Sequence, residues 1–264
     1  MDRIRKWITL SLVVVAILVG LFYPRKEDPV LDWDKVMDLP GPVAARSTYL
    51  SENYYWEGGF LRYKDREHRI GVDVSAYQGD VDWQQVADSG VQFAVIRAGY
   101  RGSTAGELYV DDSFYNNLQQ AKDADLAVGV YFFSQAVTAE EAREEAVYVC
   151  ELLDGADLEL PVYYDWEYLD GRVPPAASMP MTECAIAFCE EVKERGYLPG
   201  VYFNQDYGYN YLDLAQLRGY HLWLAEYGNT PAFTYHYDCV QYTDSGSVPG
   251  ISGPVDLDLL FLPE

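Results

Sequence analysis

The chain has 264 residues, of which 49% are hydrophobic and 15% aromatic, which is enough for the packed core of one large domain or two small ones. Its 42 acidic and 19 basic side chains give a formal net charge of −23, and the part after residue 69 carries 8 basic against 32 acidic side chains. Such a negative field repels phosphate backbones and anionic lipid headgroups, which argues against nucleic-acid binding and against a peripheral membrane surface on this part.

The amino-terminal segment has the pattern of a membrane anchor. An uncharged run over residues 7–23 lies between basic residues on both sides. Its length is near the lower limit of about 17–25 residues for a spanning helix, and it exceeds the roughly 7–15 residue core of a secretory signal. No small-residue cleavage site follows, so we expect an uncleaved single-pass anchor rather than a cleaved signal. The basic tail before the run predicts that this tail is cytoplasmic and that the rest of the chain lies outside the membrane.

Residues 24–69 mix prolines, charges and aromatic residues without a sustained period. We interpret this segment as a stalk between the anchor and a folded domain. Within it, Gly58 and Gly59 separate two aromatic runs, which predicts a hairpin over 54–63. The predicted organisation is therefore an anchor over 1–23, a stalk over 24–69 and a catalytic domain over 70–264.

From Ile70 onward, short apolar runs alternate with helical patterns. Eight strands are expected, at 69–75, 91–99, 126–134, 160–167, 198–204, 220–227, 237–243 and 253–261. Helices are expected at 82–89, 111–123, 138–154, 181–195 and 212–218. Continuous apolar strands that are followed by helices indicate a parallel sheet buried on both faces. The predicted fold class is α/β, an irregular TIM-like (β/α) barrel with degenerate last units; an open doubly wound sheet is the alternative, although no G-x-G-x-x-G follows the first strand.

Four carboxylates fall at the ends of these strands, where the catalytic residues of barrels of this kind lie. They are Asp73 on the first strand, Asp165 and Glu167 on the fourth, and Asp256 on the last. Alternation along a strand points Asp165 and Glu167 to the same side, where like charges raise at least one pKa. Each acid alone also fits a solvated loop carboxylate. Because the first and last strands of a barrel are neighbours, Asp73 and Asp256 are expected side by side.

The four cysteines, Cys150, Cys184, Cys189 and Cys239, have no C-x-x-C spacing and no nearby histidine pair. A zinc site is therefore disfavoured, and we expect buried thiols. No metal and no cofactor are predicted.

Seven segments in chain order resemble glycoside hydrolase family 25, the lysozyme-type N-acetylmuramidases. They are "GVDVSAYQGDVDW", "FAVIRAGY", "GVYFFSQA", "PVYYDWE", "GVYFN", "LWLAEY" and "VQYTDSGSVPGISGPVDLD". The resemblance runs from about residue 70 to the carboxyl end and does not cover the first 69 residues. It implies an irregular β/α barrel that hydrolyses the β-1,4 bond between N-acetylmuramic acid and N-acetylglucosamine in peptidoglycan strands.

The resemblance also assigns roles to residues. It implies that Glu167 is the general acid and that Asp165 positions the substrate or its N-acetyl group, with Asp73 and Asp256 as supporting carboxylates. Four further residues fall at positions that face the sugar groove in this family: Tyr131, Arg97, Trp223 and Tyr227. Aromatic faces suit the apolar face of a pyranose ring. In a chain with 24 tyrosines, core packing is the alternative for each aromatic residue taken singly.

Two departures from the family pattern concern the shape of the groove. Tyr77 stands where many members have histidine, and Val240 where tryptophan usually precedes "QYT". Two other functions stay open at this point: a metal-dependent hydrolase built on the same acids, and a glycan-binding module without turnover.

Overall fold

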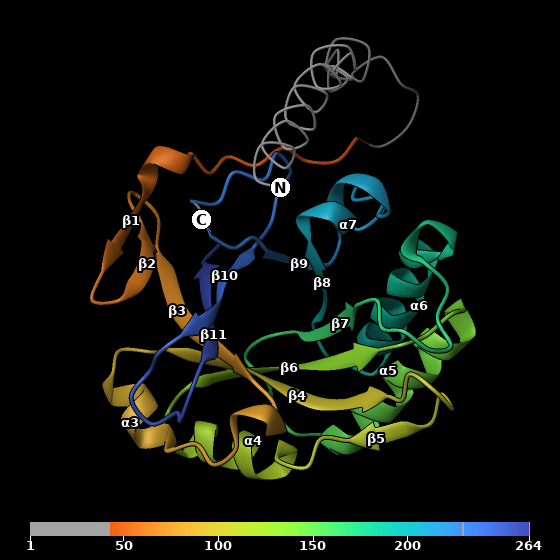
Figure 1. Ribbon diagram of the computed structural model, residues 1–264, viewed down its shortest axis with the longest axis horizontal. Helices are drawn as coiled ribbons and strands as arrows, with labels where there is room; N and C mark the ends of the chain where they lie inside the picture. Colours follow the sequence, from red (N-terminus) through yellow and green to blue (C-terminus); the bar gives the residue numbers. More distant parts are fainter. Residues whose placement is uncertain (1–42, 229, 264) are drawn as a thin grey trace, which may run out of the picture. The chain divides into compact units, whose positions relative to one another are not determined.

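Eight strands close into a ring in the computed structural model, which describes residues 43–228 and 230–263 (Figure 1). In ring order the strands are β3 (His68–Val74), β4 (Phe93–Arg101), β6 (Ala127–Ser134), β7 (Val162–Trp166), β8 (Pro199–Asn204), β9 (His221–Ala225), β10 (Cys239–Gly246) and β11 (Val255–Phe261). The short β5 (Leu108–Val110) pairs with β4 outside the ring. All eight predicted strands are confirmed, and closure through β3 and β4 selects the barrel over the open sheet.

The last strand runs against the others. Neighbours from β3 to β10 are parallel, whereas β11 is antiparallel to both β10 and β3. The predicted parallel sheet therefore does not extend to β11. The connection between β10 and β11 covers only residues 247–254 and contains no helix. A parallel pair needs a crossover of about a dozen residues or more, so this short connection returns the chain in the opposite direction.

Helices cover the outside of the barrel from β4 to β8. They are α3 (Trp83–Asp88), α4 (Phe114–Asp123), α5 (Ala139–Leu153), α6 (Met181–Glu194) and α7 (Gln205–Asn210), with single 3-10 turns η1 (Ser51–Asn53), η2 (Ala76–Gln78) and η3 (Ala176–Ser178). Four helices match the predictions, but the helix expected at 212–218 is wrong. The last helix is α7 instead, because the Asn204 side chain accepts the Tyr207 amide at 3.0 Å and caps a helix directly after β8.

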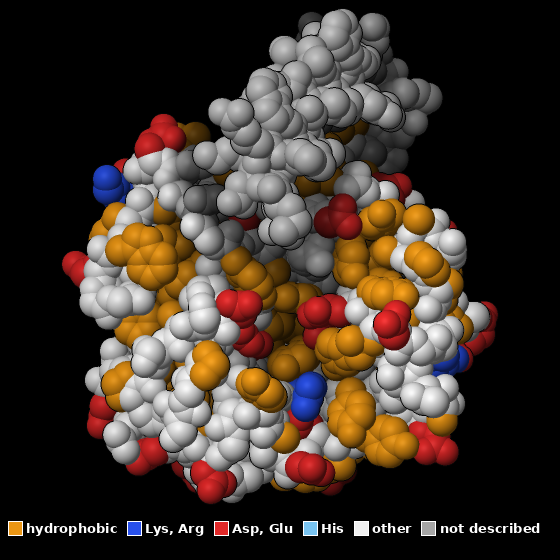
Figure 2. All heavy atoms as spheres, in the orientation of Figure 1, with side chains coloured by type: hydrophobic (Ala, Val, Ile, Leu, Met, Phe, Trp, Pro, Cys, Tyr) orange, Lys and Arg blue, Asp and Glu red, His pale blue; other side chains and the backbone are white. Residues whose placement is uncertain are grey.

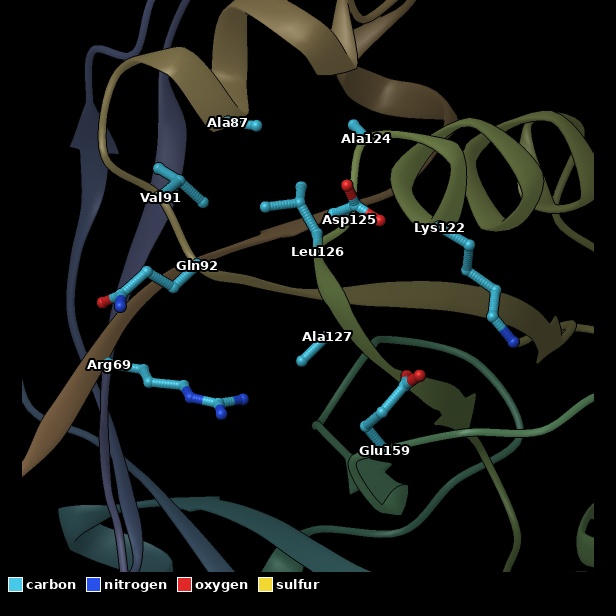
Figure 3. Close-up of a pocket in the computed structure, with 10 residues that line it drawn as sticks. All are labelled: Arg69, Ala87, Val91, Gln92, Lys122, Ala124, Asp125, Leu126, Ala127 and Glu159. Carbon is cyan, nitrogen blue, oxygen red and sulfur yellow. The ribbon is translucent and has the colours of Figure 1, made fainter.

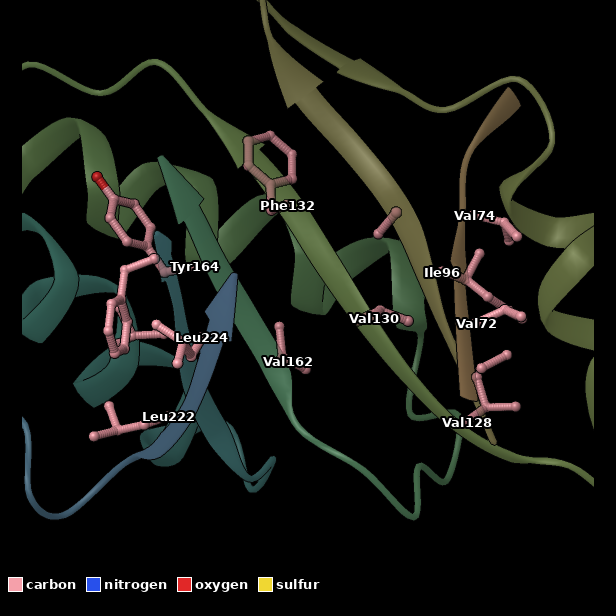
Figure 4. Close-up of a cluster of buried hydrophobic side chains, with 14 of the residues drawn as sticks. Val72, Val74, Ile96, Val128, Val130, Phe132, Val162, Tyr164, Leu222 and Leu224 are labelled. Carbon is pink, nitrogen blue, oxygen red and sulfur yellow. The ribbon is translucent and has the colours of Figure 1, made fainter. Parts of the chain in front are cut away.

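Two sets of side chains fill the space on either side of the strands. Outward-facing residues such as Val72, Ile96 and Val130 pack under the helices in the main core (Figure 4). The interior holds a second cluster that includes Phe93 and Tyr163. Glycines make room for these two rings: a Cβ at Gly71 would lie 2.2 Å from Phe93 Cζ, and a Cβ at Gly200 would lie 2.4 Å from Tyr163 Cδ1.

A hairpin packs against β3, β10 and β11 on the part of the barrel that none of the described helices covers. The predicted hairpin is confirmed as β1 (Tyr54–Glu57) paired antiparallel with β2 (Phe60–Tyr63), and Figure 1 shows it beside β3. The Leu61 amide donates to Tyr242 OH at 3.3 Å, and the hydroxyls of Tyr54 and Tyr237 lie 2.6 Å apart. Upstream, the Tyr49 ring stacks on Phe261 at 3.8 Å. The compact unit therefore begins at Ala44, upstream of the domain start predicted at residue 70.

The four cysteines are buried free thiols, as predicted. Burial raises the pKa of Cys150 to about 11 and that of Cys184 to about 12, so both stay protonated and unreactive. The predicted anchor at 7–23 lies outside the described residues. Over residues 43–228 and 230–263, none of the helices has the length and apolar content needed to span a bilayer.

Candidate active site

A cavity of about 180 Å³ opens at the end of the barrel where the parallel strands terminate. Figure 2 shows acidic side chains around a hollow in the middle of this face, with hydrophobic side chains between them. The cavity is lined by Asp73, Arg97, Tyr131, Phe133, Asp165, Glu167, Tyr202, Trp223, Tyr227, Gln241 and Asp256. All eight residues singled out from the sequence are thus brought together, whereas Phe133, Tyr202 and Gln241 were missed.

The two acids around Trp166 reach the cavity by strand alternation. Asp165 is the penultimate residue of β7 and Glu167 follows the strand directly, and both line the cavity. Tyr164 and Trp166, which alternate with the two acids along the chain, belong to the outer core. This is the predicted arrangement. Asp165 is 4% exposed, and no described residue gives a hydrogen bond to its buried Oδ1. That oxygen therefore keeps an unused acceptor position.

Burial and nearby negative charge raise the pKa of both acids. Burial is the larger cause at Asp165, followed by the charge of Glu167; at Glu167, burial is followed by the charge of Asp256. The positive charge of Arg97 opposes the rise at Asp165. This cation favours the ionised form of Asp165, whereas burial, the larger cause, favours its protonated form.

Asp73 and Asp256 face each other across the junction of the first and last strands, as predicted, since they are register partners in the β3–β11 ladder. Asp256 does not lie at the carboxyl end of its strand, however. It is the second residue of β11, and the reversed direction of that strand brings it to the mouth. Burial raises the pKa of Asp256 to about 6, and burial followed by the charge of Asp258 raises that of Asp73.

Asp258 lies two residues further along β11, deeper in the barrel, and was missed. It is fully buried and accepts the Trp223 Nε1 proton at 2.8 Å. Burial raises its pKa to about 8. The D-x-D pattern of "VDLD" indicates that Asp258 shares the inward face with Asp256, because residues two apart on a strand point to the same side.

Gln241 connects three residues of the cavity. Its Nε2 donates to Asp73 Oδ2 at 2.6 Å, and its Oε1 accepts the hydroxyls of Tyr202, at 2.8 Å, and Tyr227. One amide therefore orients an acid on one wall and two phenols on the opposite wall. Its polar character at an inward position of an otherwise apolar run was the sequence signal.

Arg97 is fixed beside the cavity by a buried acid. Its Nε donates to Asp111 Oδ2 at 2.7 Å, and Asp111 also accepts the backbone amides of Ala76 and Ser113. The guanidinium lies over the Tyr100 ring at 5.5 Å. These contacts keep a positive charge near Asp165 without pairing the two directly.

The aromatic residues divide into a floor and a rim. Trp223 is 2% exposed and packs against Tyr202 and Tyr131 with ring centroids 4.7 and 6.2 Å apart. It forms the floor of the cavity and also packs in the interior cluster. Tyr227 is 44% exposed and lines the rim of the cavity. Val240 is fully buried in the outer core, so its departure from the family pattern does not reach the cavity.

A larger cavity of about 580 Å³ lies at the opposite end of the barrel (Figure 3). Arg69, Lys122, Asp125 and Glu159 contribute charges to its lining. Lys122 donates to the Asp157 carbonyl, and Glu159 accepts the Val128 amide. The charged groups of both side chains therefore already have hydrogen-bond partners in the protein. None of the convergent acids lies there, and we place the chemistry in the smaller cavity. Within the described ranges, no group of three or more His, Cys, Asp or Glu side chains is arranged to hold a metal ion.

Comparison with known proteins agrees with this geometry. The family model described as glycosyl hydrolases family 25 matches residues 72–251. An autolytic lysozyme of Clostridium acetobutylicum is 31% identical over 189 residues, which cover 71% of this chain and 54% of that protein. The modular autolysin LytC of Streptococcus pneumoniae, solved with a synthetic peptidoglycan ligand, has a TM-score of 0.65 at 24% identity, covering 82% of this chain and 52% of its own.

A family 25 glycosyl hydrolase from Bacillus anthracis has a TM-score of 0.61 at 23% identity, covering 77% of this chain and 93% of its own. At these identities the two solved structures show the shared fold. The chain spans about half the length of the Clostridium lysozyme and of LytC.

Proposed function

Because the chain belongs to glycosyl hydrolase family 25, we propose that it is a muramidase that cleaves the β-1,4 bond between N-acetylmuramic acid and N-acetylglucosamine in peptidoglycan. The observation that carries this proposal is the pair of buried acids at the end of β7, whose pKa values are both raised and which share one cavity. A glycosidase needs one protonated and one ionised carboxyl at the scissile bond, and such a pair supplies both.

In the proposed mechanism Glu167 donates its proton to the glycosidic oxygen as the bond from C1 to that oxygen breaks. The carbonyl oxygen of the sugar's own 2-acetamido group attacks C1 from the other side and forms a cyclic intermediate. Asp165 accepts the acetamido N–H and orients the group. Glu167, now ionised, takes a proton from water as that water attacks C1 and reopens the ring. Two inversions at C1 give overall retention.

Three features support a substrate-assisted route over direct attack by a carboxylate. Residues two apart on a strand lie on the same side of the sugar, at roughly 6.5 Å between Cα atoms, which is awkward for acids that must work from opposite faces. Asp165 Oδ1 has no donor among the described residues, as an acetamido acceptor requires. Arg97 favours the ionised form of Asp165 that accepts this N–H.

The test is digestion of purified peptidoglycan by a fragment of residues 44–264. Mass spectrometry should find N-acetylmuramic acid at the new reducing ends, and proton NMR of the first product should show the β-anomer. De-N-acetylated glycan should be cleaved far more slowly, and chelator should leave the rate unchanged.

An initial α-anomer would show inversion at C1. The nucleophile would then be a water activated by Asp73 or Asp256 rather than the acetamido group. Loss of activity in chelator with rescue by Mg²⁺, Mn²⁺ or Zn²⁺ would favour the metal-dependent hydrolase. Tight glycan binding without any new reducing ends would identify a binding module instead.

We further propose that the uncharged run at 7–23 anchors the protein in the cell membrane with the catalytic domain outside, where peptidoglycan lies. Membrane fractions should contain the full-length chain, and protease added to intact protoplasts should release the domain. A mature protein that begins near residues 20–25 and is freely soluble would contradict the anchor.

A further inference from the structure

Glu167 is held at its backbone by a side chain from the neighbouring strand. It lies one residue beyond the end of β7, where the strand ladder no longer fixes it. Gln135, one residue beyond the end of β6, donates from Nε2 to the Glu167 carbonyl at 2.7 Å. Gln135 is 0% exposed, and the same Nε2 donates to the Ser134 carbonyl at 2.7 Å. A buried amide therefore spans the two strand ends directly behind the acid.

Arg172 in turn fixes Gln135. Its Nη1 donates to the Gln135 carbonyl at 2.6 Å and to Glu141 Oε2 at 2.9 Å, while its Nη2 donates to Glu141 Oε1. The Arg172 amide also donates to the Ser103 carbonyl at 2.8 Å, which ties the segment after β7 to the turn between β4 and β5.

Glu141 lies in the first turn of α5, where its amide is capped by Thr138 and its Oε2 accepts the Val137 amide. The chain of contacts thus ends on a rigid element.

We propose that Gln135 and Arg172 are positioning residues that set the place of the Glu167 carboxyl, a role that rests on the proposed function of Glu167 as general acid. Neither side chain lines the cavity. Their effect passes through the Glu167 backbone: the bidentate pair with Glu141 holds Arg172, Arg172 holds the Gln135 backbone, and the Gln135 amide holds the Glu167 carbonyl. Because proton transfer needs the acid within hydrogen-bond distance of the glycosidic oxygen, a small displacement at this carbonyl reduces turnover.

The decisive variant is Arg172→Met, with Arg195→Met as its control. Arg195, one residue beyond the end of α6 and away from the cavity, forms an ion pair with Glu191 at 2.7 Å, so the control also removes one arginine and one ion pair. With a soluble glycan substrate, Arg172→Met should lower kcat by about 10- to 100-fold with KM changed less than about twofold, since a displacement near 1 Å costs up to about 10²-fold. Arg195→Met should change neither value.

Three further variants separate positioning from simple destabilisation. Arg172→Lys keeps the charge but not the fork of donors, and it should recover part of kcat. Glu141→Gln should lower kcat as well, and combining it with Arg172→Met should add little, because both act on one contact chain. Gln135→Met, if it folds, should match Arg172→Met in kcat. Thermal melting measures the folded fraction of every variant.

The proposal is overturned if kcat per folded molecule in Arg172→Met and Arg172→Lys equals that of the wild type, or if KM rises while kcat stays constant. These outcomes are distinct from failure of the proposed function, because the wild-type chain establishes in the same assay whether the muramidase reaction occurs and Glu167→Gln establishes whether it depends on Glu167.

Discussion

Replacing Glu167 with Gln is expected to reduce the turnover of peptidoglycan by about 10³-fold or more, within the range for loss of a general acid. Glutamine has almost the same shape but no proton to transfer to the leaving oxygen. The fold should stay intact, because the substitution removes a carboxyl whose ionised form is disfavoured by burial. Release of reducing ends from peptidoglycan measures the loss, and substrate binding should persist.

Glu159→Gln is the matched control, since it makes the same change in the larger cavity at the other end of the barrel. It should leave turnover unchanged. Asp165→Asn should lower turnover strongly but less completely than Glu167→Gln, because an amide still contacts the acetamido group. An active Glu167→Gln variant, or a Glu159→Gln variant that is inactive although folded, would refute our assignment of the site.

The raised pKa of Glu167 also fixes the direction of the pH dependence. A general acid works only while protonated, so kcat/KM should fall as pH rises through the Glu167 pKa. Burial, followed by the charge of Asp256, places this fall above the ordinary range of a glutamate.

Removing residues 44–66 is expected to have the largest effect on stability. In the 44–264 fragment this segment and its hairpin cover Phe261, Tyr237 and Tyr242 on the outer face of the last strands. Exposing an aromatic or aliphatic core side chain costs about 1.5–3 kcal/mol, so losing several such contacts approaches the whole stability of a domain, roughly 5–15 kcal/mol. A 67–264 fragment should be insoluble or should unfold at a much lower denaturant concentration than the 44–264 fragment.

Two point substitutions in the hairpin give reference values for the stability difference between the two fragments. Leu61→Ala, at a side chain only 2% exposed, should cost about 2–5 kcal/mol. Trp56→Ala, at a side chain 64% exposed in the same hairpin, should cost much less. If the 67–264 fragment melts within a few degrees of the 44–264 fragment, the hairpin is dispensable.

Much of the barrel was predictable because buried strands leave continuous apolar runs, and the acids that follow them are conspicuous. The position of Asp165 and Glu167 on one face follows from alternation alone. The direction of β11 was not predictable in this way, since the same pattern of residues fits a strand running either way, and only pairing with β3 and β10 decides it. Gln241 and Asp258 were missed because their importance comes from partners on other strands: Asp73 and Tyr202 for Gln241, and Trp223 for Asp258.

The reversed last strand also decides where additional modules can be attached. His68 at the start of β3 pairs with Phe261 at the end of β11, and both lie at the end of the barrel opposite Asp73 and Asp256. A parallel eighth strand would instead have ended at the mouth, and any fused domain would have begun beside the groove. With β11 reversed, a wall-binding or reporter domain joined after Leu262 starts at the far end of the barrel. A domain joined there therefore begins on the side of the barrel away from the cavity.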